Sequence, residues 1–146
     1  MDAVHADRYG LGRPLGRVSG REGVVSEKGV DQLREPPVRG IELLDGSVVV
    51  SLAGELDLYN AHEVRDALAD AAEQKPERIV VDLSHVEFVD STALGLLIEA
   101  SSRLENRRAF LLAAPGLSTR RALEISGLAR HFGIHDTVED ARAAEF

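Results

Sequence analysis

Short apolar runs alternate with amphipathic segments from about residue 39 onward, and this alternation limits the folds open to the chain. The mainly apolar runs Ile79–Leu83 and Ala109–Ala113 have the length and composition of strands buried on both faces. The segments between the runs repeat apolar residues at helical spacing. Strands that alternate with helices predict an α/β fold, in which a mixed, mostly parallel sheet is covered by about four helices.

Turn residues mark the expected boundaries of these elements. Asp45-Gly46 supplies the positive φ angles of a two-residue hairpin, which predicts two antiparallel strands within residues 41–53. Asn60 and Glu63 match a capping box at the start of the next helix, which Lys75-Pro76 ends. The later elements are expected as a strand at Ile79–Leu83, a helix from about Thr92 to Glu105, a strand at Ala109–Ala113, a helix opened by Ser118 or Thr119 and stopped by Gly127, a short strand at Phe132–Ile134 and a helix from Thr137.

Two of the expected helices have a clear apolar stripe that would pack on the sheet. In the first helix the stripe consists of Ala61, Val64, Ala67, Leu68, Ala71 and Ala72. The acidic residues of that helix are expected on its solvated side: Glu63, Asp66, Asp70 and Glu73. In the second helix the stripe consists of Ala93, Leu94, Leu97, Ala100 and Leu104.

The first 38 residues differ in composition from the rest of the chain. Residues 1–40 contain seven of the 13 glycines and three of the five prolines, without sustained periodicity. They carry a net charge of +1 in a chain of net charge −8, which leaves −9 for the remainder. Such a segment buries too little apolar surface to offset its ordering entropy. We therefore expect a flexible extension over residues 1–38 and one domain over residues 39–146.

Composition excludes several classes of protein. The chain has no cysteine, which excludes disulfides, iron–sulfur clusters and cysteine nucleophiles and suits a reducing cytoplasm. No apolar run approaches the roughly 18 residues of a membrane span, and the first residues lack the pattern of a secretory signal. The negative net charge argues against direct binding of nucleic acid. A cytoplasmic protein is expected.

The motifs of the common enzyme classes are missing from the sequence. It contains no Walker A loop, no Gly-x-Ser-x-Gly elbow and no His-Glu-x-x-His helix. His131 and His135 are four residues apart, but Gly133 lies between them and no third metal ligand is evident. We interpret both as partly exposed histidines near a helix end, and we expect no catalytic site, metal or cofactor.

One cluster of polar residues follows a buried strand and leads directly into a helix. This is Asp90-Ser91-Thr92, followed by Ala93-Leu94-Gly95. Asp, Ser and Thr are the residues that cap helix N-termini, so the cluster has a purely structural interpretation. The carboxyl ends of strands are also where α/β proteins bind ligands and partners. Gly95, in the first turn, suggests the close approach of another group.

Two motifs together resemble a known family. Asp90-Ser91-Thr92-Ala93-Leu94-Gly95, following the strand Ile79–Leu83, is similar to the signature of STAS-domain anti-sigma-factor antagonists, and Gly54-Glu55-Leu56-Asp57 is similar to a second motif of that family. A looser match is Pro115 followed by Leu123–Leu128. The resemblance covers about residues 40–144, in the family's order and spacing.

The resemblance implies a switch protein without activity of its own. In the family, the serine that matches Ser91 is phosphorylated by an anti-sigma factor that is itself a serine kinase and holds the ATP and Mg²⁺. The unphosphorylated antagonist binds this kinase and releases the sigma factor, and a PP2C-type phosphatase resets the switch. The residues implied in partner binding are Asp57, Asp90, Ser91, Thr92, Leu94 and Gly95.

The sequence departs from the family pattern in two places. Ala93 stands where the family usually has Gly, and residues 1–38 have no counterpart in the minimal domain. Neither departure removes Ser91. The alternative function is that of a STAS module with another task, either in a stressosome-like scaffold or as an accessory subunit of a lipid or anion transporter.

Deletion of residues 1–37 is expected to leave the thermal unfolding midpoint within a few degrees of that of the full chain, because the segment lacks the apolar residues to build a core. Thermal denaturation followed by circular dichroism measures the difference. A large fall in the midpoint would show that this segment packs on the domain.

Overall fold

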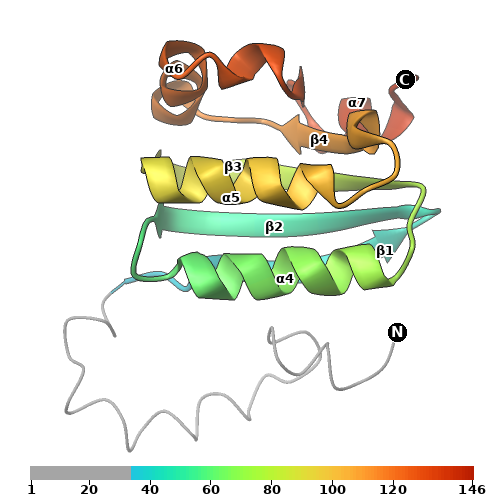
Figure 1. The fold of residues 1–146 in the computed structure, drawn as a ribbon, viewed down its shortest axis with the longest axis horizontal. Coiled ribbons are helices and arrows are strands. Elements are labelled where there is room, and N and C mark those ends of the chain that lie inside the picture. Colours follow the sequence, from blue (N-terminus) through green and yellow to red (C-terminus); the bar gives the residue numbers. More distant parts are fainter. Residues whose placement is uncertain (1–33) are drawn as a thin grey trace, which may run out of the picture.

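The computed structural model describes residues 34–146, which form a five-stranded mixed sheet with helices on both faces (Figure 1). The strands lie in the order β1-β2-β3-β4-β5, with β1 antiparallel to β2 and the other neighbours parallel. The predicted α/β fold is confirmed. The strands are β1 Val38–Leu44, β2 Ser47–Leu56, β3 Arg78–Val89, β4 Phe110–Ala113 and β5 Gly133–His135. The helices are α4 Ala61–Glu73, α5 Ser91–Ser102, α6 Leu117–Ile125 and α7 Val138–Ala143, with short 3₁₀ helices η1 Arg107–Ala109 and η2 Leu128–Arg130.

The predicted hairpin joins β1 to β2. Asp45 and Gly46 form the turn with φ angles of 47° and 86°. Positive φ angles at both residues are what the predicted two-residue hairpin requires. Leu44 therefore pairs with Ser47. In this register the valines of β2 are buried beneath the helices. A side chain at Gly46 would also contact the carboxyl group of Glu77.

Strand β3 is much longer than the predicted run Ile79–Leu83, because it pairs with all of β2. At two register shifts, between Ser51 and Ala53 and between Gly54 and Glu55 of β2, β3 contains one residue more than β2. The pairing continues to Leu56 opposite Val89. Two strands therefore end together at one edge of the sheet.

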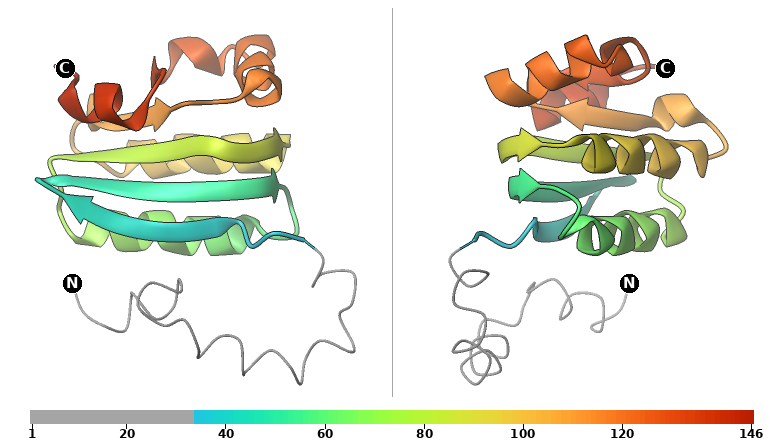
Figure 2. Two further views of the ribbon diagram at one scale, coloured as in Figure 1. Left: turned by 180° about the vertical axis from the view of Figure 1, so that it is seen from behind. Right: turned by 60° about the vertical axis from the view of Figure 1, so that its left-hand side comes forward.

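The sheet divides the hydrophobic core into two parts, one on each of its faces. Helices α4, α5 and α6 cover one face of the sheet, and α7 covers part of the other (Figure 2). The larger cluster includes the predicted stripes of α4 and α5, with Leu96 in addition. The smaller cluster joins Ala141 of α7 to Val49, Val80, Leu111 and Ala113. Within residues 34–146 no helix is long and apolar enough to cross a membrane.

The predicted capping box at Asn60 is wrong. Asn60 is the N-cap residue of α4, but its side chain makes no capping hydrogen bond. Its Oδ1 instead accepts from the Asp57 N–H at 2.9 Å, and its Nδ2 donates to the Glu55 carbonyl at 2.8 Å. The preceding loop thus uses the side chain that the capping box would need.

Four further details differ from expectation. Asp70 is buried, because it lies at the margin of the α4 stripe, three residues after Ala67. Helix α6 has Gly116 as its N-cap, so neither Ser118 nor Thr119 opens it, and Thr119 is buried. Helix α5 ends at Ser102, and the last strand, β5, begins one residue later than predicted.

The predicted extension overlaps the described part of the chain at residues 34–38, and these residues contact the domain. Val38 begins β1, and the Pro37 carbonyl accepts from the Ala53 N–H at 2.9 Å. A side chain at Gly54 would touch Glu35. The prediction for residues 1–33 lies outside the described residues. Deletion of residues 1–37 therefore also removes these contacts, whereas deletion of residues 1–33 keeps them.

Leu97→Ala is expected to lower the free energy of unfolding by about 2–5 kcal/mol, because Leu97 is 1% exposed in the main core and its truncation leaves a cavity. Chemical denaturation measures the change. Leu43→Ala is the matched control, since Leu43 is exposed near the hairpin and its truncation should change stability by at most about 0.5 kcal/mol. If the denaturation curves of Leu97→Ala and the native chain coincided, the assignment of the buried face of α5 would be wrong.

Candidate functional site

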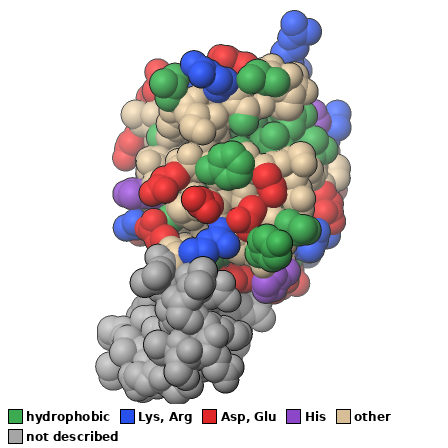
Figure 3. All heavy atoms as spheres, turned by 90° about the vertical axis from the view of Figure 1, so that its left-hand side faces the viewer, with side chains coloured by type: hydrophobic (Ala, Val, Ile, Leu, Met, Phe, Trp, Pro, Cys, Tyr) green, Lys and Arg blue, Asp and Glu red, His purple; other side chains and the backbone are tan. Residues whose placement is uncertain are grey.

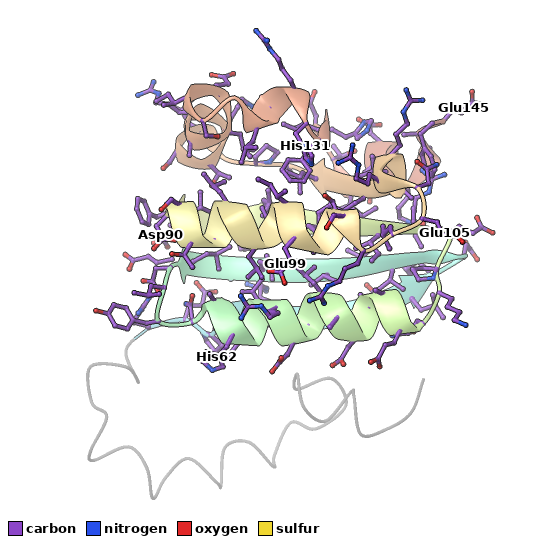
Figure 4. The ribbon with its side chains drawn as sticks, in the orientation of Figure 1. His62, Asp90, Glu99, Glu105, His131 and Glu145 are labelled. Carbon is purple, nitrogen blue, oxygen red and sulfur yellow. The ribbon has the colours of Figure 1, made fainter. Side chains whose placement is uncertain are left out.

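The two motifs meet at the carboxyl ends of β2 and β3. The Asp90 N–H donates to the Leu56 carbonyl at 3.0 Å, just beyond the last paired residues of the two strands. This bond places the loop 57–60 beside the first turn of α5. Figure 4 shows Asp90 at this edge, where α4 and α5 both begin. Parallel pairing thus joins segments that are far apart in the sequence.

The carboxylate of Asp90 links α5 to that loop. Its Oδ1 accepts from the Ala93 N–H at 2.9 Å, which caps α5. Its Oδ2 accepts from the Leu58 N–H at 3.1 Å. The capping interpretation of the polar cluster is therefore correct for Asp90. Ser91 and Thr92 follow the cap as the first residues of the helix.

Asp57 organises the loop and binds an arginine from outside the predicted domain. Its Oδ1 accepts from the Tyr59 N–H at 3.0 Å, and its Oδ2 lies 2.8 Å from the guanidinium group of Arg34. Arg34 also donates to the Glu55 carbonyl at 3.3 Å. Arg34 was not predicted as a site residue, because it lies in the glycine- and proline-rich stretch, whose composition does not mark a partner for Asp57.

The proposed site residues of α5 lie in different environments. Ser91 is exposed, and within residues 34–146 its hydroxyl group has no hydrogen-bond partner. Thr92 is half-buried and Gly95 is exposed. A Cβ atom at Gly95 would meet nothing within 4 Å, so no described group of this chain approaches that side of the helix. Leu94 is 8% exposed and packs in the main core, as its place in the predicted apolar stripe requires, so its side chain offers a partner little surface.

Exposed apolar side chains lie at the same edge of the sheet as Ser91. Leu58 and Tyr59, in the loop after β2, are 63% and 79% exposed. Phe88 near the end of β3 and Leu117 at the start of α6 are also exposed. We call the surface formed by Leu58, Tyr59, Phe88, Ser91, Gly95 and Leu117 the Ser91 face. Figure 3 shows apolar side chains interspersed with acidic ones on this side of the molecule.

The apolar side chains of the Ser91 face were not predicted from the sequence. Leu58 and Tyr59 gave a usable signal, since two large apolar residues stand in a loop where polar turn residues are usual. Phe88 gave none, because its position in an apolar segment also fits a buried strand residue. Exposed apolar side chains that gather at one site are typical of a protein-binding surface.

The histidine pair that we considered for a metal does not form a site of that kind. His131 follows η2 and His135 lies in β5, so the two do not share a helix. Among residues 34–146, no group of three or more His, Asp or Glu side chains is arranged to hold a metal ion.

Residues 39–141 match the family model of the STAS domain. The chain belongs to the STAS domain family. The anti-sigma-F factor antagonist RsfB of Mycobacterium tuberculosis is 34% identical to this STAS protein over 97 residues, which cover 66% of this chain and 80% of RsfB. The predicted resemblance to the anti-sigma factor antagonists of this family is confirmed.

Solved structures of anti-sigma factor antagonists are also similar to this chain. The crystal structure of an anti-sigma factor antagonist from Mycobacterium paratuberculosis is 34% identical, with a TM-score of 0.66, and covers 70% of this chain and 87% of its own. The Bacillus protein SpoIIAA in its phosphorylated form is 27% identical, with a TM-score of 0.54, and covers 70% of this chain and 94% of its own. The fold of this STAS domain is therefore shared with antagonists that have been solved.

Asp90→Ala is expected to lower the free energy of unfolding by about 0.5–2 kcal/mol, because it removes the cap of α5. It also frees the Leu58 N–H, whose hydrogen exchange should become faster. Asp66→Ala, at an exposed position of α4, is the matched control. Unchanged exchange at Leu58 in Asp90→Ala would show that Asp90 does not hold the loop.

Proposed function

We propose that this STAS domain is an anti-sigma factor antagonist that binds an anti-sigma factor serine kinase while Ser91 is unphosphorylated, and so releases the sigma factor. Phosphorylation of Ser91 by that kinase ends the binding, and a PP2C-type phosphatase restores it. The protein acts in the cytoplasm as a substrate and a binding module, and it has no catalytic activity of its own. The names of its relatives support the general role.

The exposed hydroxyl group of Ser91 carries this proposal. It lies at the first residue of α5, within the Ser91 face and free of hydrogen bonds to residues 34–146. A kinase can therefore reach it without unfolding the helix. Thr92 is less accessible, because its side chain is half-buried. That SpoIIAA has been solved in both a phosphorylated and an unphosphorylated form further supports control by phosphorylation.

A phosphate on Ser91 is expected to change the fold very little. It adds about −1.5 to −2 charges at pH 7. The N-terminus of α5 attracts these charges by roughly 0.3–1 kcal/mol. Asp90 and Asp57 repel them, but Asp57 is already paired with Arg34. These opposing effects are of similar size, so the phosphorylated protein keeps its structure.

Binding to the kinase is expected to respond much more strongly. The Ser91 face combines a neutral hydroxyl group with apolar side chains, and a partner that covers it must desolvate whatever Ser91 carries. A buried dianion without a matching cation is costly. A cost of roughly 3 kcal/mol corresponds to about a hundredfold weaker binding. The Ser91 face therefore binds the kinase while Ser91 is unphosphorylated and releases it once Ser91 carries a phosphate.

Ser91→Asp and authentic phosphoserine are expected to keep the native circular dichroism spectrum and to bind the cognate anti-sigma factor about a hundredfold more weakly. Ser91→Ala should bind with native affinity and should not be phosphorylated, which leaves sigma activity constitutively high. Calorimetric titration with and without ATP measures the affinities. Equal affinity of all forms, or phosphate found on Thr92, would contradict the mechanism.

Two controls separate the local effect from a general effect of charge or apolar surface. Ser102→Asp adds the same charge at the other end of α5 and should bind normally. Tyr59→Ala removes an apolar side chain of the Ser91 face and should weaken binding, whereas Leu43→Ala removes one near the hairpin and should not. A pull-down that recovers transporter or scaffold proteins in place of a kinase would favour the alternative function.

A further inference from the structure

A concave surface lies at the edge of the sheet opposite to Ser91. It is a cleft of about 570 Å³ at the amino ends of β4 and β5, bounded by η1, η2 and the last three residues. Its lining includes Arg107, Arg108, Arg130, His131 and His135. Figure 4 shows Asp90 at one end of the molecule and Glu145, which lines this cleft, at the other.

The three arginines of the cleft lack the ion pairs that most other arginines of residues 34–146 form. Six arginines of residues 34–146 form ion pairs: Arg34, Arg39, Arg65, Arg103, Arg120 and Arg142. Arg107, Arg108, Arg121 and Arg130 form neither an ion pair nor a side-chain hydrogen bond with these residues. Three of these four line the cleft. In a chain of net charge −8, most of the unpaired arginines of residues 34–146 are thus gathered at one site.

The far wall of the cleft is held in place by Arg78. Its guanidinium group donates to the carbonyls of Ala141 and Ala144 at 2.8 and 2.7 Å. It also lies 4.7 Å from the centre of the Phe146 ring. The chain after α7 is therefore fixed against the domain and closes one side of the cleft.

The other walls are also preformed. Gly133 packs closely against Leu111, because a Cβ atom there would come within 2.8 Å of a methyl group of Leu111. The ring of His131 is oriented by an edge-on contact with Phe132, with ring centres 4.8 Å apart, and its Nε2 lies 3.4 Å from the Ser101 hydroxyl group. A preformed site binds a small ligand with little loss of conformational entropy.

We propose that this cleft binds a small molecule carrying two or more phosphate groups. Guanidinium groups match phosphate oxygens in charge and bidentate geometry. Arg107 and Arg108 approach from η1 and Arg130 approaches from η2, so cations from two elements can engage more than one phosphate. Glu145 is the only carboxylate side chain among the lining residues. A volume of about 570 Å³ exceeds the needs of one phosphate and lies within the usual range of small-ligand sites.

Calorimetric titration of the full chain with inorganic pyrophosphate and with a nucleoside diphosphate tests the proposal. Both probes should bind, with affinity that falls as salt is added. Arg130→Ala and the double substitution Arg107→Ala/Arg108→Ala should each weaken binding by about tenfold or more. Arg121→Ala removes the unpaired arginine outside the cleft and is the matched control, which should bind as the native chain does.

The outcomes separate the proposal from its alternatives. Loss of binding in the cleft variants alone supports it. Tighter binding of the nucleoside diphosphate than of pyrophosphate would show that the site also contacts the nucleoside. Equal weakening by Arg121→Ala and Arg130→Ala, or no binding of either probe, would overturn the proposal. Tighter binding of a polyglutamate peptide than of pyrophosphate would also overturn it, in favour of an acidic protein partner. Binding of the anti-sigma factor at Ser91 is a separate measurement, so either proposal can fail alone.

Discussion

The parallel pairing of β2 with β3 is the constraint on which the rest of the structure depends. Their valines and leucines are almost fully buried, so the two strands form the centre of the sheet and of its core. The pairing continues through two register shifts until both strands end together. Every element that forms the Ser91 face begins or ends at that edge.

The edge created by this pairing holds Ser91 apart from the interactions that stabilise the fold. Asp90 uses both carboxylate oxygens to join the loop after β2 to the first turn of α5. Ser91 then projects from a helix that is already capped, and its hydroxyl group is not needed for the fold. A chemical change at Ser91 can thus alter what binds there while the core is unaffected. Because Arg34 pairs with Asp57, the segment before β1 also belongs to this edge.

The opposite edge of the sheet has a different electrostatic character. There the strands begin, and the connecting segments carry arginines without acidic partners in residues 34–146. Around Ser91, by contrast, acidic side chains lie among apolar ones. The two edges are formed by different connecting segments, so their surface residues can differ while the core between them stays the same.

The sequence by itself determined the fold class, the order of the elements and the hairpin at Asp45-Gly46, because these follow from periodicity and local backbone preference. It also placed Ser91 at the start of a helix. Only the tertiary structure decided which polar groups meet at the Ser91 face: Arg34 reaches Asp57, and the Asp90 carboxylate accepts from the Leu58 N–H. These outcomes depend on distant segments that the sheet brings together, and no local pattern in the sequence contains that information.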